Sequence, residues 1–173
     1  MTEKTKEIVN KQIQEELYSA YLYLALAARL ESLNLKGMAN WMQIQAKEEV
    51  DHAQGFFKFL VERQEEPVLE AIAKPEVKDL KDALAIFTAG LKHEQHITAK
   101  INAIYELARS EKDYALESFV KWYIDEQVEE EANANENIDK IKRLGADGPA
   151  LYMLDQELAA RAYVPGGPYA AKA

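Results

Sequence analysis

Four long stretches of the chain repeat apolar residues at the spacing of an amphipathic helix, and this pattern restricts the fold more than any other feature. The stretches cover roughly residues 4–33, 38–64, 80–109 and 114–144. The first and third joins between them are short, and short joins make antiparallel neighbours. The middle join is long enough to run the length of a bundle. We therefore expect an all-α fold, a four-helix bundle made of two helical hairpins linked by a long crossover.

Local signals mark the ends of these helices. A glycine-containing stop, residues 34–37, ends the first helix, and Pro67 closes the second because proline disfavours the helical conformation at the residue before it. Residues 110–113 break the third helix and are expected to cap the fourth, which ends at residues 145–148.

A short fifth helix is expected at roughly residues 149–162, because Leu151, Leu154 and Leu158 share one face there. The five helices would form one domain, residues 1–162, of a size that a single hydrophobic core supports. A tail containing glycine and proline follows, and we expect residues 163–173 to be turn-rich and mobile.

The apolar seam of each long helix, meaning the line of residues that faces the core, is interrupted near its middle by a glutamate. The polar seam residues include Glu16 and Tyr23 in the first helix, Gln45, Glu49 and His52 in the second, Glu94 and Thr98 in the third, and Gln127 and Glu130 in the fourth. In the third helix we follow the seam through Leu80, Leu84, Phe87, Leu91, Glu94, Thr98, Ile101 and Tyr105. The middles of long antiparallel helices lie at one level, so four glutamates and one histidine are expected to meet inside the bundle.

Buried carboxylates of this kind need protons or cations. An isolated buried charge is very unfavourable, several together also repel, and no lysine or arginine lies in the seams to neutralise them. Carboxylate oxygens with one imidazole suit iron, manganese or zinc. Glu49 and His52 form a Glu-x-x-His step on one helix face, which two-iron bundles combine with a glutamate from each other helix.

Simpler interpretations exist for each residue alone. A single seam glutamate is usually a boundary residue that reaches solvent, and a lone buried histidine such as His52 is more often hydrogen-bonded than bound to metal. Four glutamates at the same level, with a histidine at the right step, favour the metal site.

Other candidates are weaker. Tyr23 could hydrogen-bond a ligand or give up an electron, and it could equally be core; Gln127 could border the site. Glu48, Glu126 and Glu129 could hold a further cation, although residues 129–131 could also be a solvated acidic run.

The remaining histidines and large apolar residues carry no such prediction. His93 and His96 lack the spacing of zinc proteases, and we interpret them as surface or interface residues. Trp41, Trp122 and Met42 are more typical of packing than of cofactor contacts.

The composition excludes several classes of function. A net charge of −9 argues against nucleic-acid binding and fits the attraction of cations. The chain contains no cysteine, which excludes disulfides, thiolate metal sites and Fe–S clusters. No signal-peptide pattern or membrane-spanning stretch is visible, so we expect a cytoplasmic protein that binds no membrane.

Several motifs resemble those of the non-haem bacterial and archaeal ferritins. They cover residues 15–23, 40–42 with 48–53, 92–94, 119–123 with 126–131, and 154–158. The resemblance extends over residues 5–161 and implies a ferritin-like bundle whose copies, 24 of them, enclose a hollow cage. It also implies iron storage and a ferroxidase activity, in which dioxygen oxidises Fe(II) to Fe(III) at a dinuclear centre within each subunit.

The resemblance assigns roles to particular residues. Glu16, Glu49 and His52 would hold one iron, Glu49 would bridge, and Glu94 with Glu130 would hold the second. Gln127 would border this centre, and Tyr23 would match the tyrosine beside it. Glu48, Glu126 and Glu129, with Glu130, would match a third iron site.

Departures from related families are informative. Bacterioferritins place a haem-ligating methionine directly after the second-helix glutamate, where this chain has Val50, so no haem is expected. Two other functions remain open from the sequence. One is a two-iron oxygenase or peroxidase without storage, and the other is a non-catalytic helical scaffold.

Overall fold

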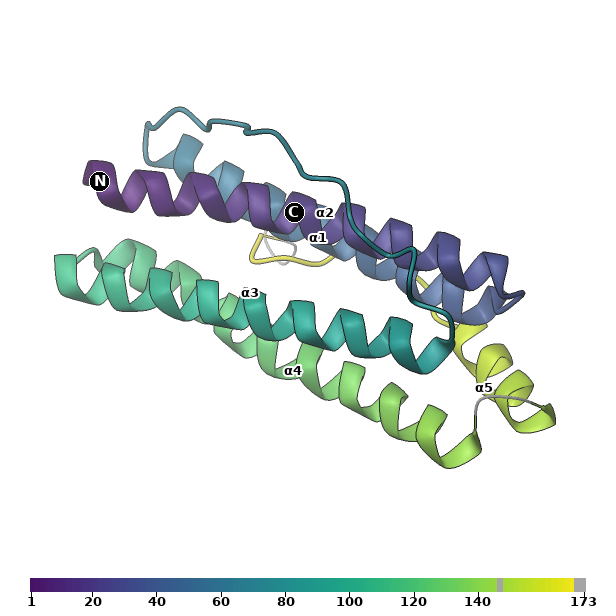
Figure 1. The fold of residues 1–173 in the computed structure, drawn as a ribbon. Helices are drawn as coiled ribbons and strands as arrows, with labels where there is room; N and C mark the ends of the chain where they lie inside the picture. Colours follow the sequence, from purple (N-terminus) through teal and green to yellow (C-terminus); the bar gives the residue numbers. More distant parts are fainter. Residues whose placement is uncertain (146–147, 170–173) are drawn as a thin grey trace.

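The computed structural model describes residues 1–145 and 148–169, and within them it contains helices and no strand. The helices are α1 (Glu3–Ser32), α2 (Lys36–Glu62), α3 (Ala83–Glu111), α4 (Tyr114–Leu144) and α5 (Pro149–Ala159). Two antiparallel hairpins, α1–α2 and α3–α4, pack into one bundle (Figure 1). The all-α, four-helix architecture with a short fifth helix is confirmed.

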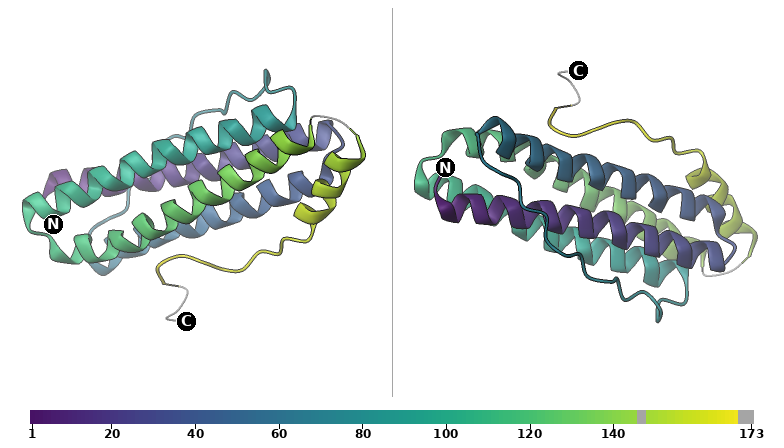
Figure 2. Two further views of the ribbon diagram at one scale, coloured as in Figure 1. Left: turned by 90° about the horizontal axis from the view of Figure 1, so that it is seen from below. Right: turned by 90° about the horizontal axis from the view of Figure 1, so that it is seen from above.

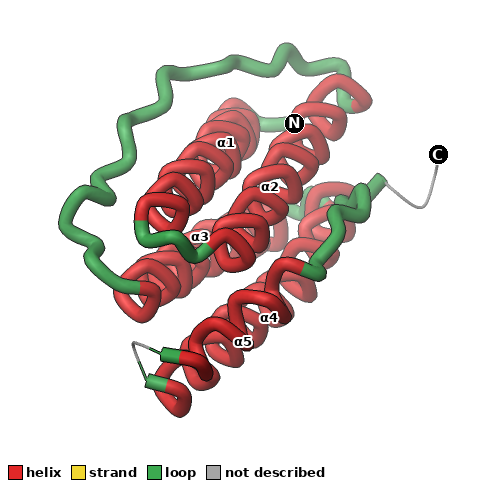
Figure 3. The backbone as a smooth tube through the Cα atoms, turned by 90° about the vertical axis from the view of Figure 1, so that its right-hand side faces the viewer, coloured by secondary structure: helices red, strands yellow, loops and turns green. Residues whose placement is uncertain are grey.

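The crossover between the hairpins, residues 63–82, runs the length of the bundle (Figure 1) and lies outside α1 (Figure 3). Hydrogen bonds fasten it to that helix. The backbone N–H of Val68 donates to Asn10 Oδ1 at 2.6 Å, and Gln14 Nε2 donates to the carbonyl of Ala71. This segment carries the chain from the end of α2 to the start of α3 so that the two hairpins lie side by side.

Side-chain caps fix several helix ends. Asp113 Oδ1 accepts the N–H of Leu116 at 3.1 Å, which confirms the predicted cap of α4. Asp82 Oδ1 accepts the N–H of Ala85 at 2.7 Å, and α3 therefore begins at Ala83 rather than at residue 80. The fourth helix ends at Leu144 as expected, although two residues of its predicted stop, 146 and 147, lie outside the described residues.

The turn between α1 and α2 differs from the prediction. Asn34 takes the left-handed conformation with φ of 60°, so asparagine, and not Gly37, reverses the chain. Gly37 instead lies inside α2, where a Cβ atom would stand 1.6 Å from the carbonyl oxygen of Asp155. Because this glycine has no side chain, α5 can approach α2 closely.

Substitution of Gly37 by alanine is expected to destabilise the protein by roughly 1–3 kcal/mol, the usual cost of forcing extra volume into packed structure. The contact that must give way is the α5 backbone, since the nearest atoms all belong to Asp155 and Ala159. Urea unfolding would measure the change. Gly90→Ala is the matched control, because its Cβ would meet only Tyr23 at 3.7 Å. Equal shifts in the two variants would contradict the close approach.

The core is divided into two apolar clusters by a polar layer at mid-height. One cluster lies toward α5 and includes Leu30, Met42 and Phe87, while the other lies at the opposite end and includes Phe56 and Ile101. Trp41 belongs to the first cluster and Trp122 packs against the second, as predicted for packing residues. The polar layer between them holds the candidate centre.

The phase of α3 was predicted incorrectly in part. Phe87, Glu94 and Ile101 are buried as expected, but Leu80, Leu84, Leu91, Thr98 and Tyr105 are only partly buried. The buried face instead includes Gly90, Ile97 and Ile104, so it is rotated toward the neighbouring position. Tyr23 of α1 lies against Gly90, where an added Cβ atom would make an ordinary van der Waals contact with the Tyr23 ring at 3.7 Å.

The fifth helix buries Leu151, Leu154 and Leu158 as predicted, and it ends at Ala159, earlier than residue 162. Its end is set by α2, because Asn40 Nδ2 donates to the carbonyl of Arg161 at 3.1 Å. None of the helices in the described ranges is long and apolar enough to cross a membrane.

The described part of the tail contacts α2, which the sequence did not predict, and the mobility of the tail stays a prediction. Residues 160–169 run along α2 (Figure 2). Asp51 Oδ2 accepts both the Tyr163 hydroxyl, at 2.6 Å, and the backbone N–H of Gly166, at 3.0 Å. Tyr169 donates to Glu62 at 2.8 Å near the end of α2. Residues 170–173 lie outside the described range.

Candidate metal centre

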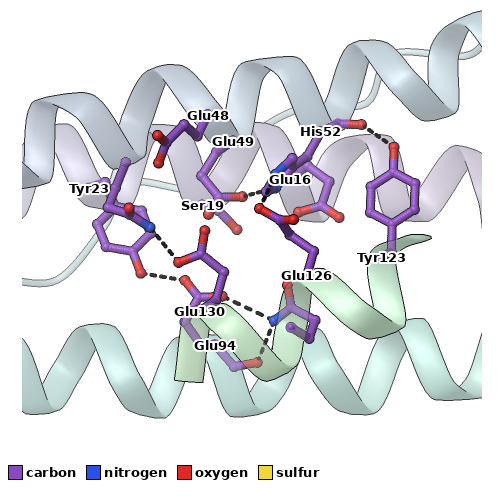
Figure 4. Close-up of polar contacts among 12 residues, drawn as sticks. Glu16, Ser19, Tyr23, Glu48, Glu49, His52, Glu94, Tyr123, Glu126 and Glu130 are labelled. Atoms are coloured by element: carbon purple, nitrogen blue, oxygen red, sulfur yellow. Dashed lines mark hydrogen bonds and ion pairs between the residues drawn. The ribbon is translucent and has the colours of Figure 1, made fainter. Parts of the chain in front are cut away.

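Glu16, Glu49 and His52 form the tightest group of possible metal ligands. Each offers one ligand atom, and these atoms all lie within 4.8 Å of one another. Glu49 and His52 lie one turn apart on α2, and His52 Nδ1 is 3.3 Å from Glu49 Oε2. Glu16 faces them from α1, and all three side chains are buried (Figure 4). The predicted Glu-x-x-His step therefore does turn into the bundle.

The other two seam glutamates approach from the second hairpin. Glu94 of α3 and Glu130 of α4 are buried, and both point toward α2 (Figure 4). Tyr23 OH donates to one oxygen of Glu94, and Gln127 Nε2 donates to the other at 3.1 Å. Gln45 Nε2 donates to Glu130 Oε2 at 2.7 Å. The structure thus places all five main candidates, with Tyr23 and Gln127, in one polar layer.

Two carboxylate oxygens in this layer lack a hydrogen-bond partner. They are Glu16 Oε2 and Glu49 Oε1, although the second oxygen of Glu16 accepts from Gln12 at 2.9 Å. Buried polar atoms are nearly always paired in folded proteins, and an unpaired one points to a missing ion or water. Each carboxylate is therefore oriented by the protein on one side and left free on the other, as a metal ligand must be.

Burial raises the pKa values of the centre. The pKa values of Glu16 and Glu49 lie well above the usual range, chiefly through burial and then through neighbouring carboxylates. Burial and the charge of Glu94 raise the pKa of Glu130 to about 8. Protons therefore occupy part of the centre near neutral pH, and an incoming cation must displace them.

The candidates for a further cation site form the rim of the centre. Glu126 Oε1 is 3.8 Å from His52 Nε2, and Glu48 binds Arg161 Nη2 at 2.6 Å. Burial raises the pKa of both carboxyls. Glu129 is exposed, and its charge adds to the raised pKa of Glu126. Two of the three predicted residues are thus held at the rim, while the third lies in solvent.

The sequence analysis assigned no role to two amides that hold the carboxylates, although it placed Gln45 in the seam of the second helix. Gln12 lies one turn before Glu16 and binds it, whereas Gln45 of α2 reaches across to Glu130 of α4. A signal was present, since a glutamine lies four residues before the glutamate on both α1 and α2. Which carboxylate each amide would bind depends on packing and could not be read from spacing.

The two histidines outside the centre, His93 and His96, differ in their exposure and contacts. His96 is exposed and pairs with Glu15 at 3.1 Å, as expected of a surface residue. His93 is half-buried between α1 and α3, where it packs against Tyr18 and contacts Ser19 Oγ through Nε2 at 2.7 Å. Burial lowers its pKa to about 4, so it is neutral near pH 7.

Comparison with known proteins agrees with this geometry. Residues 6–144 match the sequence profile of the ferritin family, described as a ferritin-like domain. The chain belongs to the ferritin family. It is 38% identical over 157 residues to the bacterial non-heme ferritin of Staphylococcus saprophyticus, covering 91% of this chain and 93% of that protein. The corresponding protein of Staphylococcus epidermidis is 37% identical over 155 residues, covering 90% and 93%.

Solved ferritin structures share the whole fold. A ferritin of the archaeon Archaeoglobus fulgidus, engineered into a closed form, superimposes with a TM-score of 0.92 at 42% identity. The match covers 95% of this chain and 99% of that one. An open-pore ferritin of the same organism gives a TM-score of 0.91 at 42% identity, covering 94% and 98%. Membership of the ferritin family, predicted from the motifs, is confirmed.

Proposed function

We propose that this ferritin subunit binds two ferrous ions at the polar layer, oxidises them with dioxygen and stores the ferric product. The observation that carries the proposal is the buried group of four glutamates and one histidine, with an unpaired oxygen on Glu16 and on Glu49. This donor set suits iron. Family membership supports storage, since the relatives that it matches are named ferritins.

Each half of the centre has its own role. Glu16 and His52 hold the first ion, Glu94 and Glu130 hold the second, and Glu49 lies between them as the bridge. The raised pKa of Glu49 supports this position, because the charges of both Glu94 and Glu130 act on it. Each ferrous ion gives up one electron, and dioxygen takes up the pair.

The surrounding residues orient these ligands. Tyr23 and Gln127 donate to opposite oxygens of Glu94, which fixes its carboxylate before iron arrives. Protons released from the carboxylates leave as each ion binds. No haem takes part in this proposal, because Val50 carries no atom that could ligate haem iron.

Storage requires many copies of the chain around one cavity, and we propose the 24-subunit cage implied by the motifs. Exposed apolar side chains on one side of the bundle support self-association. They include Tyr21 and Leu24 on α1 and Val68, Leu69 and Ile72 on the crossover. The net charge of −9 per chain favours the attraction of cations.

The mass of the assembly and its iron content test this proposal together. Light scattering should give a particle of many 19.6 kDa chains, and aerobic Fe(II) addition should load it with far more iron than its dinuclear centres can hold. A monomer or dimer that still oxidises iron would contradict storage and favour the two-iron oxygenase or peroxidase. An assembly that oxidises iron no faster than buffer would favour the scaffold.

A further inference from the structure

Arg161 enters the rim of the centre from outside the four-helix bundle. Its Nη2 atom lies 2.6 Å from Glu48 Oε2, and its Nη1 atom contacts the carbonyl of Trp41 at 3.4 Å. The guanidinium also stacks on the Trp41 ring, 4.6 Å from its centre. Three contacts therefore hold this cation, which distinguishes it from a surface lysine free to swing into solvent.

The chain around Arg161 is fastened on both sides. Asn40 binds the Arg161 carbonyl at 3.1 Å, so the backbone is tied to α2 at the residue itself. Further along, Asp51 accepts from both Tyr163 and Gly166. The described tail thus forms a strap, residues 160–169, along α2 (Figure 2). Arg161 in this strap contacts Glu48 of α2. The strap fixes where the guanidinium can reach.

Arg161 pairs with Glu48, a carboxylate that a further cation beside the centre would use as a ligand. Glu48 lies next to Glu49 in sequence, and Glu48 and Glu126 both border the centre (Figure 4). Glu126 in turn lies 3.8 Å from His52. A divalent ion bound by Glu48 and Glu126 would lie close to the positive guanidinium of Arg161, which already contacts Glu48.

We propose that Arg161 is the resident counter-cation of this rim and determines how tightly the rim binds a divalent ion beyond the dinuclear pair. Such an ion binds only when the guanidinium leaves Glu48 and gives up its contacts with Trp41. The native protein therefore binds a divalent cation only weakly at the rim, while the inner carboxylates remain free to bind the two ions of the centre. The inference rests on the proposed dinuclear function, because it concerns an ion additional to those two.

Titration of the full, assembled protein with Zn²⁺ under calorimetry tests this role. Zn²⁺ undergoes no oxidation, so binding is measured without turnover. We expect two tight ions per chain in the wild type and a third in Arg161→Gln, bound at least about ten-fold more tightly than any third ion of the wild type. Arg161→Lys keeps a positive charge at the rim and should remain close to the wild type.

Two further variants separate the rim from a general change in charge. Lys11→Gln removes an exposed cation that pairs with Glu70 on the far side of α1, and it should leave the third ion weak. Adding Glu48→Gln to Arg161→Gln should abolish the gain. An unchanged third ion in Arg161→Gln, or a gain that survives the loss of Glu48, would overturn the inference. Absence of the two tight ions in the wild type would instead contradict the proposed function.

Discussion

Replacement of Glu49 by glutamine is expected to lower the initial rate of Fe(II) oxidation by at least about 100-fold, since a bridging ligand shared by both ions is lost. Glutamine keeps the volume and one oxygen of the side chain but removes its charge. Glu49 Oε1 has no hydrogen-bond partner among the described residues, and the charges of Glu94 and Glu130 act on this carboxyl. Stopped-flow absorbance after mixing with Fe(II) in air measures the rate.

The assembly should survive this change, because Glu49 contributes no hydrogen bond that joins the two hairpins. Glu7→Gln serves as the matched control, since Glu7 is an exposed glutamate on α1, more than two turns before Glu16. It should oxidise iron at the wild-type rate. A Glu49→Gln protein that assembles and oxidises iron within two-fold of the control would refute the bridging role.

The metal-free protein is expected to lose stability as pH rises from about 5 to 8. The pKa of Glu130 is about 8 in the folded chain and near 4.5 when unfolded. Between these values the folded chain binds the proton more strongly, so raising the pH favours the unfolded chain. The contribution of Glu130 to the free energy of unfolding is therefore fully present below pH 4.5. It is lost as the pH rises toward 8, by an amount on the order of 4 kcal/mol.

Glu130→Gln isolates that contribution. Glutamine cannot ionise, so the variant should match the wild type near pH 5 and exceed it near pH 8, as measured by denaturant unfolding in the presence of a chelator. The raised pKa values of Glu16 and Glu49 act in the same direction and leave a smaller slope in the variant. Parallel curves for the two proteins would show that Glu130 is ionised in the empty centre.

The sequence predicts much of this architecture because helix periodicity acts locally. The seam positions of Glu16, Glu49, Glu94 and Glu130 all proved to be buried, and the capping role of Asp113 was visible in its residue type. These features depend on neighbours within a few turns of the same helix.

The features that the sequence did not predict depend on packing between elements. The rotation of α3 buries Gly90, Ile97 and Ile104 against the other helices, and the apolar pattern along α3 did not reveal it. The tail docks on α2 through Asp51, whose carboxylate accepts a hydrogen bond from Tyr163. This tyrosine lies more than a hundred residues further along the chain. The pairing of Gln45 with Glu130 likewise joins helices from different hairpins.

Anomalous diffraction at the iron edge, from crystals soaked with Fe(II) without oxygen, tests the dinuclear centre most directly. The account predicts two iron peaks inside each four-helix bundle. One should lie beside Glu16 and His52, the other beside Glu94 and Glu130, with Glu49 contacting both. Iron found only on outer carboxylates, with no peak between the helices, would contradict it.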